Sequence, residues 1–148
     1  MSFDAGAFLL QTVPFARTLG ITFDKVDDGY AVCRLPDRPD LHNHLGGPHA
    51  GALFTLAETA SGAAMLSQLG DQLSRAVPLA TGSTIHYRKL AKGEVVAEAR
   101  LLGSRAEIVA RLDAGERPEF DVAVEIKTLD GTLTTELTVS WTLRPNRP

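Results

Sequence analysis

The chain has 148 residues, of which 44% are hydrophobic, with a net charge of −3 and a single cysteine, Cys33. These values predict one compact domain, residues 1–148, with a sizeable core, and the charge argues against a nucleic-acid binder. No apolar run is long enough to span a membrane, the start lacks the pattern of a signal peptide, and one cysteine forms no internal disulfide, so we expect a cytoplasmic protein with a packed Cys33 thiol.

The first part of the chain predicts a short helix followed by a β-hairpin. Apolar residues recur at helical spacing over residues 3–12, and Asp4 can cap the first turn. Two short strands, Ile21 to Lys25 and Tyr30 to Leu35, flank an Asp28-Gly29 dipeptide, which is a strong hairpin signal. We therefore expect a packing helix and a pair of antiparallel strands.

A loop rich in glycine and histidine, His42 to Gly51, precedes the most apolar stretch of the chain. That stretch, Ala52 to Leu69, contains one charged residue, Glu58. Alanine, leucine and methionine dominate it and glycines flank it, so we predict a long helix buried inside the fold. A carboxylate is costly to bury unless a partner pairs with it or a reaction uses it.

The remainder predicts further strands and a second, short helix. Strand patterns cover Ala80 to Leu90, Val95 to Leu102, Phe120 to Lys127 and Leu137 to Leu143. A capping box, Ser104-Arg105-Ala106-Glu107, predicts a helix over residues 104–114. About six strands and one long helix of matching length give an α+β fold, in which a curved antiparallel sheet wraps the helix.

The start of the long helix and Glu58 together suggest a site that needs two chains. The N–H groups near Ala50 and Gly51 are unsatisfied donors at the positive end of a helix, and they suit a polarised carbonyl oxygen. Glu58 lies about 12 Å further along the axis, whereas attack on that carbonyl needs about 3 Å. A second, antiparallel copy of the helix would bring its own Glu58 to the carbonyl, so we expect a twofold dimer.

This stretch resembles the signature of the PaaI-like hotdog-fold acyl-CoA thioesterases. The chain has Asn43-x-x-Gly46-x-x-His49-Ala50-Gly51, and Glu58 follows nine positions after the histidine. The family pattern reads N-x-x-G-x-x-H-G-G and then an acidic residue, so Ala50 replaces a glycine, and Glu58 stands where many members have Asp. The resemblance covers roughly residues 14 to 143. It implies a hotdog fold, hydrolysis of acyl-CoA, a homodimer or homotetramer, and no cofactor or metal.

The resemblance also implies roles for the motif residues. Glu58 would attack the thioester carbonyl or activate water; the alternative is a carboxylate satisfied by the facing helix or by neighbouring threonines. Asn43 would orient the water or the carbonyl, or else bond its own loop. His49 would shape the carbonyl site or cap the helix. The N–H of Ala50, with that of Gly51, would form the oxyanion hole.

Residues outside the motif supply the expected substrate contacts. By the same resemblance, Gly82 and Ser83 would line the facing strand. Arg88 and Lys92 suit the phosphates of CoA, and an ordinary solvated edge strand is an equal alternative. The loop histidines lack an acidic or cysteine partner at ligand spacing, so we expect no metal site.

Two other functions stay open. A hotdog domain that binds acyl-CoA without turning it over is compatible with every feature above. A dehydratase or hydratase of acyl thioesters needs an acid nearer to the helix start, and the interval from Gly51 to Glu58 argues against it. The helix over residues 104–114 resembles a feature of a related hotdog subgroup whose activity is often unassigned.

Overall fold

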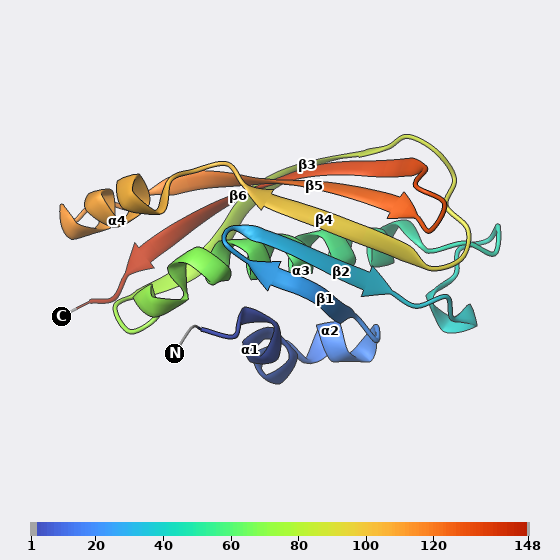
Figure 1. Ribbon diagram of the computed structural model, residues 1–148, viewed down its shortest axis with the longest axis horizontal. Helices are drawn as coiled ribbons and strands as arrows, with labels where there is room; N and C mark the ends of the chain where they lie inside the picture. Colours follow the sequence, from blue (N-terminus) through green and yellow to red (C-terminus); the bar gives the residue numbers. More distant parts are fainter. Residues whose placement is uncertain (1–2, 148) are drawn as a thin grey trace.

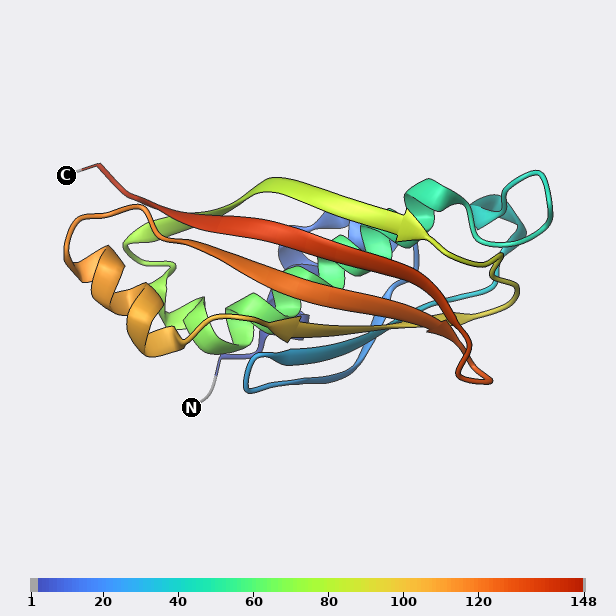
Figure 2. The ribbon, with the colours of Figure 1, turned by 90° about the horizontal axis from the view of Figure 1, so that it is seen from above.

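A curved antiparallel sheet wraps one long helix in the computed structural model, which describes residues 3–147 (Figure 1). The six strands of these residues are β1 Thr22–Asp27, β2 Tyr30–Leu35, β3 Ala76–Tyr87, β4 Val95–Leu101, β5 Glu119–Thr128 and β6 Leu133–Pro145. Their order in the sheet is β1-β2-β4-β5-β6-β3, and every neighbouring pair is antiparallel. Strands β1 (blue) and β3 (yellow-green) therefore form the two edges, as Figure 2 shows.

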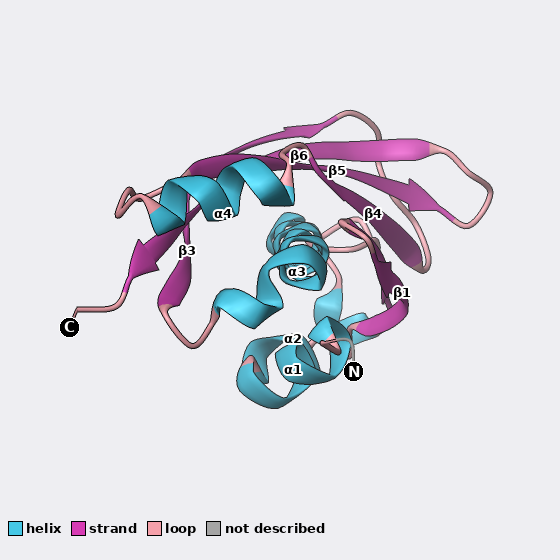
Figure 3. Cartoon of the chain, turned by 60° about the vertical axis from the view of Figure 1, so that its left-hand side comes forward, coloured by secondary structure: helices cyan, strands magenta, loops and turns pink. Residues whose placement is uncertain are grey.

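The helices pack on one face of the sheet and at one of its ends. They are α1 Ala5–Thr12, α2 Pro14–Thr18, α3 Ala50–Leu69 and α4 Arg105–Asp113, with 3-10 turns at Pro39–Leu41 and Gly70–Gln72. Helix α3 lies in the concave face of the sheet, and α1 and α2 cover the side of α3 away from the sheet (Figure 3). Helix α4 joins β4 to β5 beyond the end of the strands.

The core fills the space between α3 and the sheet. Large side chains of α3 such as Leu56 and Met65 are buried there, against alternate residues of the strands such as Val122 and Ile126. Cys33 of β2 is buried in the same core, and burial raises the pKa of its thiol. The prediction of a packed thiol is confirmed.

Most predicted elements are present, and local signals account for them. Asp28 and Gly29 both have positive φ, +53° and +76°, which two-residue hairpin turns of type I′ require. Asp4 accepts a hydrogen bond from the Ala7 N–H at 2.9 Å, and Ser104 accepts one from the Glu107 N–H at 3.4 Å. Both expected N-caps therefore form, and the α+β hotdog arrangement of a sheet around a helix is confirmed.

Several strand boundaries differ from the sequence analysis, most clearly in β3 and in β6, which begins at Leu133 rather than Leu137. Strand β3 runs from Ala76 to Tyr87 rather than from Ala80 to Leu90, because an edge strand tolerates the missing N–H of Pro78. The sequence analysis did not predict α2. Its first residue is Pro14, and proline is favourable at this position because its N–H would be unsatisfied there anyway.

The length and hydropathy of the helices also bear on membranes. Within residues 3–147, none of them is long and apolar enough to cross a lipid bilayer.

Candidate active site at the start of the central helix

The loop before α3 is held closed by Asn43. The side-chain carbonyl of Asn43 accepts from the N–H groups of Leu45 at 2.9 Å and Gly47 at 3.2 Å. Its side-chain amide donates to the Pro48 carbonyl at 3.3 Å, and its backbone N–H donates to the Gly47 carbonyl at 2.7 Å. Asn43 therefore fixes the conformation of the loop that delivers the chain to the helix.

Two glycines give this loop its path. Gly46 has φ of +78°, a conformation that side chains rarely adopt. Gly47 is buried, and a Cβ there would overlap the carbonyl oxygen of Ala91. The loop can pass against the β3–β4 connection only because residue 47 has no side chain.

His49 caps α3 with its ring. Its Nδ1 accepts a hydrogen bond from the Gly51 N–H at 2.8 Å, and its backbone φ and ψ of −63° and 143° are those of an N-cap. Since Nδ1 is an acceptor, the neutral ring carries its proton on Nε2. The Gly51 N–H is thus already engaged, whereas the N–H of Ala50 meets no acceptor within residues 3–147.

Strand β3 is tied to this helix start. The hydroxyl of Tyr87, the last residue of β3, donates to the Ala50 carbonyl at 3.1 Å. Thr55, one turn further along α3, donates to the Gly51 carbonyl at 2.9 Å. The exposed N–H of Ala50 is therefore presented by a backbone that is fixed on both sides.

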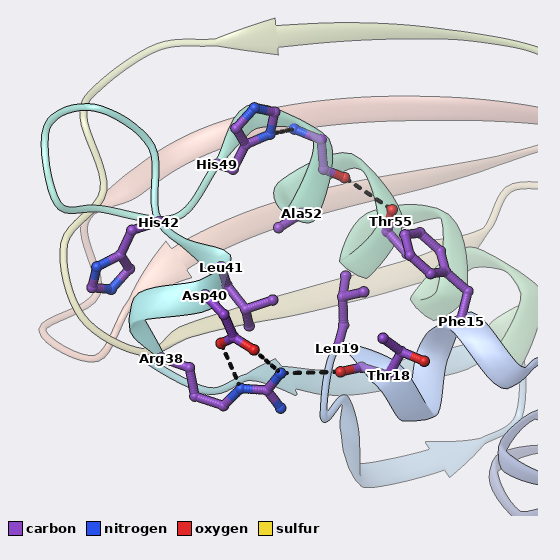
Figure 4. Close-up of a pocket in the computed structure, with 11 residues that line it drawn as sticks. Phe15, Thr18, Leu19, Arg38, Asp40, Leu41, His42, His49, Ala52 and Thr55 are labelled. Atoms are coloured by element: carbon purple, nitrogen blue, oxygen red, sulfur yellow. Dashed lines mark hydrogen bonds and ion pairs between the residues drawn. The ribbon is translucent and has the colours of Figure 1, made fainter.

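An open pocket of about 610 Å³ adjoins the helix start (Figure 4). Its lining comes from α2, the 3-10 turn and the start of α3: Phe15, Thr18, Leu19, Arg38, Asp40, Leu41, His42, His49, Gly51, Ala52 and Thr55. Arg38 bonds Asp40 through two nitrogens at 3.0 and 2.9 Å and also donates to the Thr18 carbonyl at 3.1 Å. The Arg38 guanidinium holds the pKa of Asp40 below its usual range. The pocket therefore combines apolar walls with a polar rim.

Glu58 lies on α3 beside a second, more enclosed cavity of about 240 Å³. The remaining residues that line this cavity are uncharged: Phe8, Leu9, Thr12, Val13, Thr59, Gly62, Met65, Leu66, Pro78 and Trp141. Burial raises the pKa of Glu58, and no charge or hydrogen bond from residues 3–147 offsets this effect. One part of the alternative, a Glu58 carboxylate satisfied by the neighbouring threonines Thr55 and Thr59, is not seen, because neither donates a hydrogen bond to it within residues 3–147.

The two cavities follow one face of α3. Gly51 and Thr55 border the first, and Glu58, Gly62 and Met65 border the second. Alternating steps of four and three residues keep side chains on one side of a helix. The uninterrupted helix also places Glu58 about 12 Å along the axis from Ala50, so the two groups of one chain do not meet.

The register of β3 places the two predicted facing-strand residues on opposite faces. Ser83 pairs with Val139, which is buried, so Ser83 faces the concave side that holds α3. Gly82 pairs with Ser140, whose hydroxyl donates to Asp121 at 2.7 Å on the convex side. A bulge between Ala80 and Gly82 produces this register.

The predicted phosphate contacts lie apart from both cavities. Arg88 pairs with Glu136 at 3.0 Å, and its backbone N–H donates to the Thr134 carbonyl at 2.7 Å. Lys92 borders a separate hollow beside the β5–β6 turn. Neither side chain lines the pocket at the start of α3.

The histidines of the loop have different surroundings. Nε2 of His42 lies 2.6 Å from an oxygen of Asp37, a carboxylate partner that the sequence analysis did not recognise. Among residues 3–147, no three metal-binding side chains gather in one place.

Sequence reasoning missed the walls of the first pocket, including Phe15, Leu19 and Arg38. Pro14 was the sequence signal for α2, but proline is favoured both at the first position of a helix and after the end of one. This signal could therefore not distinguish a new helix from the end of the preceding one.

Comparisons with known proteins add the family context. Residues 5–143 match the family model described as "Domain of unknown function (DUF4442)". No protein with a curated description matches the chain. Among solved structures, the chain is similar to a Pseudomonas aeruginosa protein described as a probable thioesterase, with 27% identity, a TM-score of 0.84, and coverage of 96% of this chain and 94% of that one.

Two further structures share the fold at lower identity. The Escherichia coli PaaI protein from the phenylacetic acid degradation operon is 21% identical, with a TM-score of 0.74 over 94% of this chain and 89% of that one. A thioesterase family protein from Silicibacter pomeroyi is 17% identical, with a TM-score of 0.78 over 97% of each chain. The resemblance to a hotdog-fold thioesterase family is confirmed.

Proposed function

Since the chain belongs to the DUF4442 family and has the hotdog fold of a thioesterase family, we propose that it hydrolyses an acyl-CoA thioester to the free acid and CoA. The observation that carries the proposal is Glu58, a half-buried carboxylate with a raised pKa and no partner within residues 3–147, beside an apolar cavity. Unpaired carboxylates in apolar surroundings are costly, and enzymes use them as bases or nucleophiles.

The exposed N–H of Ala50 would bind the carbonyl oxygen of the thioester, where negative charge builds up in the transition state. Glu58 of a partner subunit would take a proton from water, whose oxygen adds to the carbonyl carbon. Alternatively, Glu58 would attack that carbon itself, and water would then add to the acyl carbon of the anhydride and release the Glu58 carboxylate. In both routes the C–S bond breaks, the CoA sulfur gains a proton, and the acid keeps the oxygen from water.

This chemistry would need a twofold dimer, which would join the two groups. Strand β3 is an edge strand, and residues 79–85 of it carry no charged side chain and no proline. An uncharged edge of this length is a ready surface for pairing with a second strand. Antiparallel pairing of β3 with its copy would set the two α3 helices in opposite directions. Glu58 of each chain would then face the helix start of the other.

The other motif residues would position the reacting groups. Asn43 would shape the loop that presents the Ala50 N–H, and His49 would fix the first turn of α3 by capping Gly51. Ser83 would face the substrate from the concave side of β3, and the neighbouring Gly82 lies on the convex side. We keep Arg88 and Lys92 as candidate contacts for the phosphates of CoA, since both are exposed in the connection between β3 and β4.

The test is release of free thiol from a panel of acyl-CoA esters by purified protein. We expect turnover by the wild type and a loss of about 10²–10⁴-fold in kcat for Glu58→Gln, which keeps the shape but cannot accept a proton. Binding of acyl-CoA without thiol release would instead support a non-catalytic binding protein. A product with a new hydroxyl or double bond would identify a hydratase or dehydratase.

A further inference from the structure

A glycine in the middle of α3, Gly62, has no local explanation. Glycine destabilises a helix interior relative to alanine because it loses more conformational freedom on folding. A Cβ at Gly62 would lie 3.7 Å from Cζ2 of Trp141 and 4.0 Å from Cδ1 of Leu9, which are ordinary contacts. Neither the backbone conformation nor close packing therefore requires glycine at position 62. What the missing side chain does is leave space beside the helix.

That space belongs to the cavity beside Glu58. Gly62 is one turn after Glu58 on the same face of α3, and both line the cavity. Phe8 and Leu9 of α1 and Trp141 of β6 form other walls. A larger side chain at position 62 would project toward Trp141 and Leu9 and shorten the cavity next to the carboxylate.

The wall formed by Trp141 is rigid. Its indole N–H donates to the hydroxyl of Ser61 at 3.1 Å, and that hydroxyl donates to the Glu58 carbonyl at 2.7 Å. Ser61 is buried, so this chain of bonds fixes the ring relative to the helix turn that carries Glu58. A fixed wall at a fixed separation from the carboxylate is what selection by length requires.

The occupant follows from the size and chemistry of the cavity. Its volume of about 240 Å³ equals roughly that of eight water molecules in the liquid. An uncharged chain of about six to eight carbon atoms fits this volume and matches the apolar walls. The pocket at the start of α3 is a poorer match for such a chain, because the Arg38–Asp40 pair gives it a polar rim.

We propose that the cavity beside Glu58 holds the acyl chain of the substrate, and that the missing side chain of Gly62 sets the longest chain it accepts. The proposal rests on the function given above, since it is the thioester carbonyl at Glu58 that directs the chain into this cavity. Gly62 is then a residue that determines specificity, and Trp141 is its opposing wall.

The first test compares chain-length profiles of the wild type, Gly62→Ala, Gly62→Val and the matched control Gly6→Ala. Gly6 is a second helical glycine, in α1, that does not line the cavity. We expect kcat/KM for octanoyl-CoA, relative to butyryl-CoA, to fall at least about 10-fold in Gly62→Val and less in Gly62→Ala. The ratio should stay unchanged in Gly6→Ala. An equal ratio in all four proteins, or an equal loss on every ester, would overturn the proposal.

A second readout does not depend on turnover. Trp141 is the single tryptophan of the chain, so its fluorescence reports on the cavity. Octanamide, whose head group is uncharged, should change this fluorescence saturably in the wild type and bind at least about 10-fold more weakly to Gly62→Val. Saturable binding without hydrolysis of any acyl-CoA would refute the proposed hydrolysis and support the proposed acyl-chain pocket. Hydrolysis with no fluorescence response and with an unchanged chain-length profile in Gly62→Val would refute the proposed acyl-chain pocket and support the proposed hydrolysis.

Discussion

Replacing Ala50 by proline would delete the proposed oxyanion donor while sparing the helix. Ala50 is the first residue of α3, a position where the fixed φ of proline and its missing N–H are both accommodated. The preceding residue, His49, has φ and ψ of −63° and 143°, within the region that a residue before proline prefers. Ala50 is exposed, and its N–H bonds nothing within residues 3–147. The substitution therefore removes one donor and little else.

The expected loss is large for so small a change. Removing one oxyanion-hole donor typically costs about 10²–10³ in kcat, or about 2.7–4 kcal/mol of transition-state stabilisation. The free energy of unfolding should stay the same or rise by about 0.4–1 kcal/mol, since proline at a compatible position restricts the unfolded chain. A catalytic loss together with retained stability would distinguish the missing donor from a damaged fold.

The assay is thiol release from an acyl-CoA ester, with urea unfolding of the same preparations. Ala50→Gly serves as the matched control, because glycine keeps the N–H and is the residue of the family pattern. We expect this control to keep activity within a few-fold of the wild type. If Ala50→Pro folds normally and turns over at the wild-type rate, the Ala50 N–H does not polarise the carbonyl and the reasoning fails.

Two further substitutions probe the same site. Burial raises the pKa of Glu58, so kcat/KM should fall in acid through a pKa above the usual ~4.3 of glutamate, and Glu58→Gln should lack that limb of the pH–rate profile. The folded state also binds the Glu58 proton more tightly than the unfolded state, so the free energy of unfolding declines as pH rises from the unfolded to the folded pKa. At pH 7.5, Glu58→Gln should therefore have a higher urea midpoint of unfolding than the wild type. Equal midpoints would argue against an unfavourable buried charge. Ser61→Ala leaves the Trp141 indole N–H without its acceptor and should cost about 1–3 kcal/mol in urea unfolding, whereas an unchanged midpoint would show that the bond contributes nothing.

The elements that sequence predicted well are those whose signals are local. The Asp28-Gly29 turn, the caps at Asp4 and Ser104 and the apolar run of α3 each depend on residues within a few positions of one another. The loop from Asn43 to Gly51 and the start of α3 could also be predicted from sequence, because the glycines and the helix cap of this motif act within one loop. These features could be inferred without knowing what surrounds them.

Features that depend on distant segments could not be inferred. The pocket at the start of α3 joins Phe15 and Arg38 to the first turn of a helix that begins at Ala50, and no local pattern links these segments. The bulge after Ala80 decides which of Gly82 and Ser83 faces α3, and strand periodicity alone cannot detect one extra residue. The Trp141–Ser61 bond joins residues 80 positions apart.

The separation between Ala50 and Glu58 leads to a prediction about subunits. In one chain the two groups are about 12 Å apart along a single rigid helix, so no side-chain movement of Glu58 brings both to one carbonyl. In the proposed twofold dimer there would be two composite sites, and each would take its N–H from one chain and its carboxylate from the other. Defects in different groups should therefore complement each other between subunits.

Mixing Ala50→Pro with Glu58→Gln subunits, after dissociation and reassembly, would test this arrangement. A hybrid dimer has one site with both defects and one site with neither, because the intact Ala50 N–H comes from one chain and the intact Glu58 from the other. Random pairing makes half of the dimers hybrids, and half of the sites in each hybrid are intact, so activity should recover to about a quarter of the wild type. Because each parent protein alone is nearly inactive, the recovery is easy to measure. No recovery, with hybrids verified by mass, would mean that both groups act within one chain, which the rigid helix does not allow, and the roles of both residues would have to be abandoned.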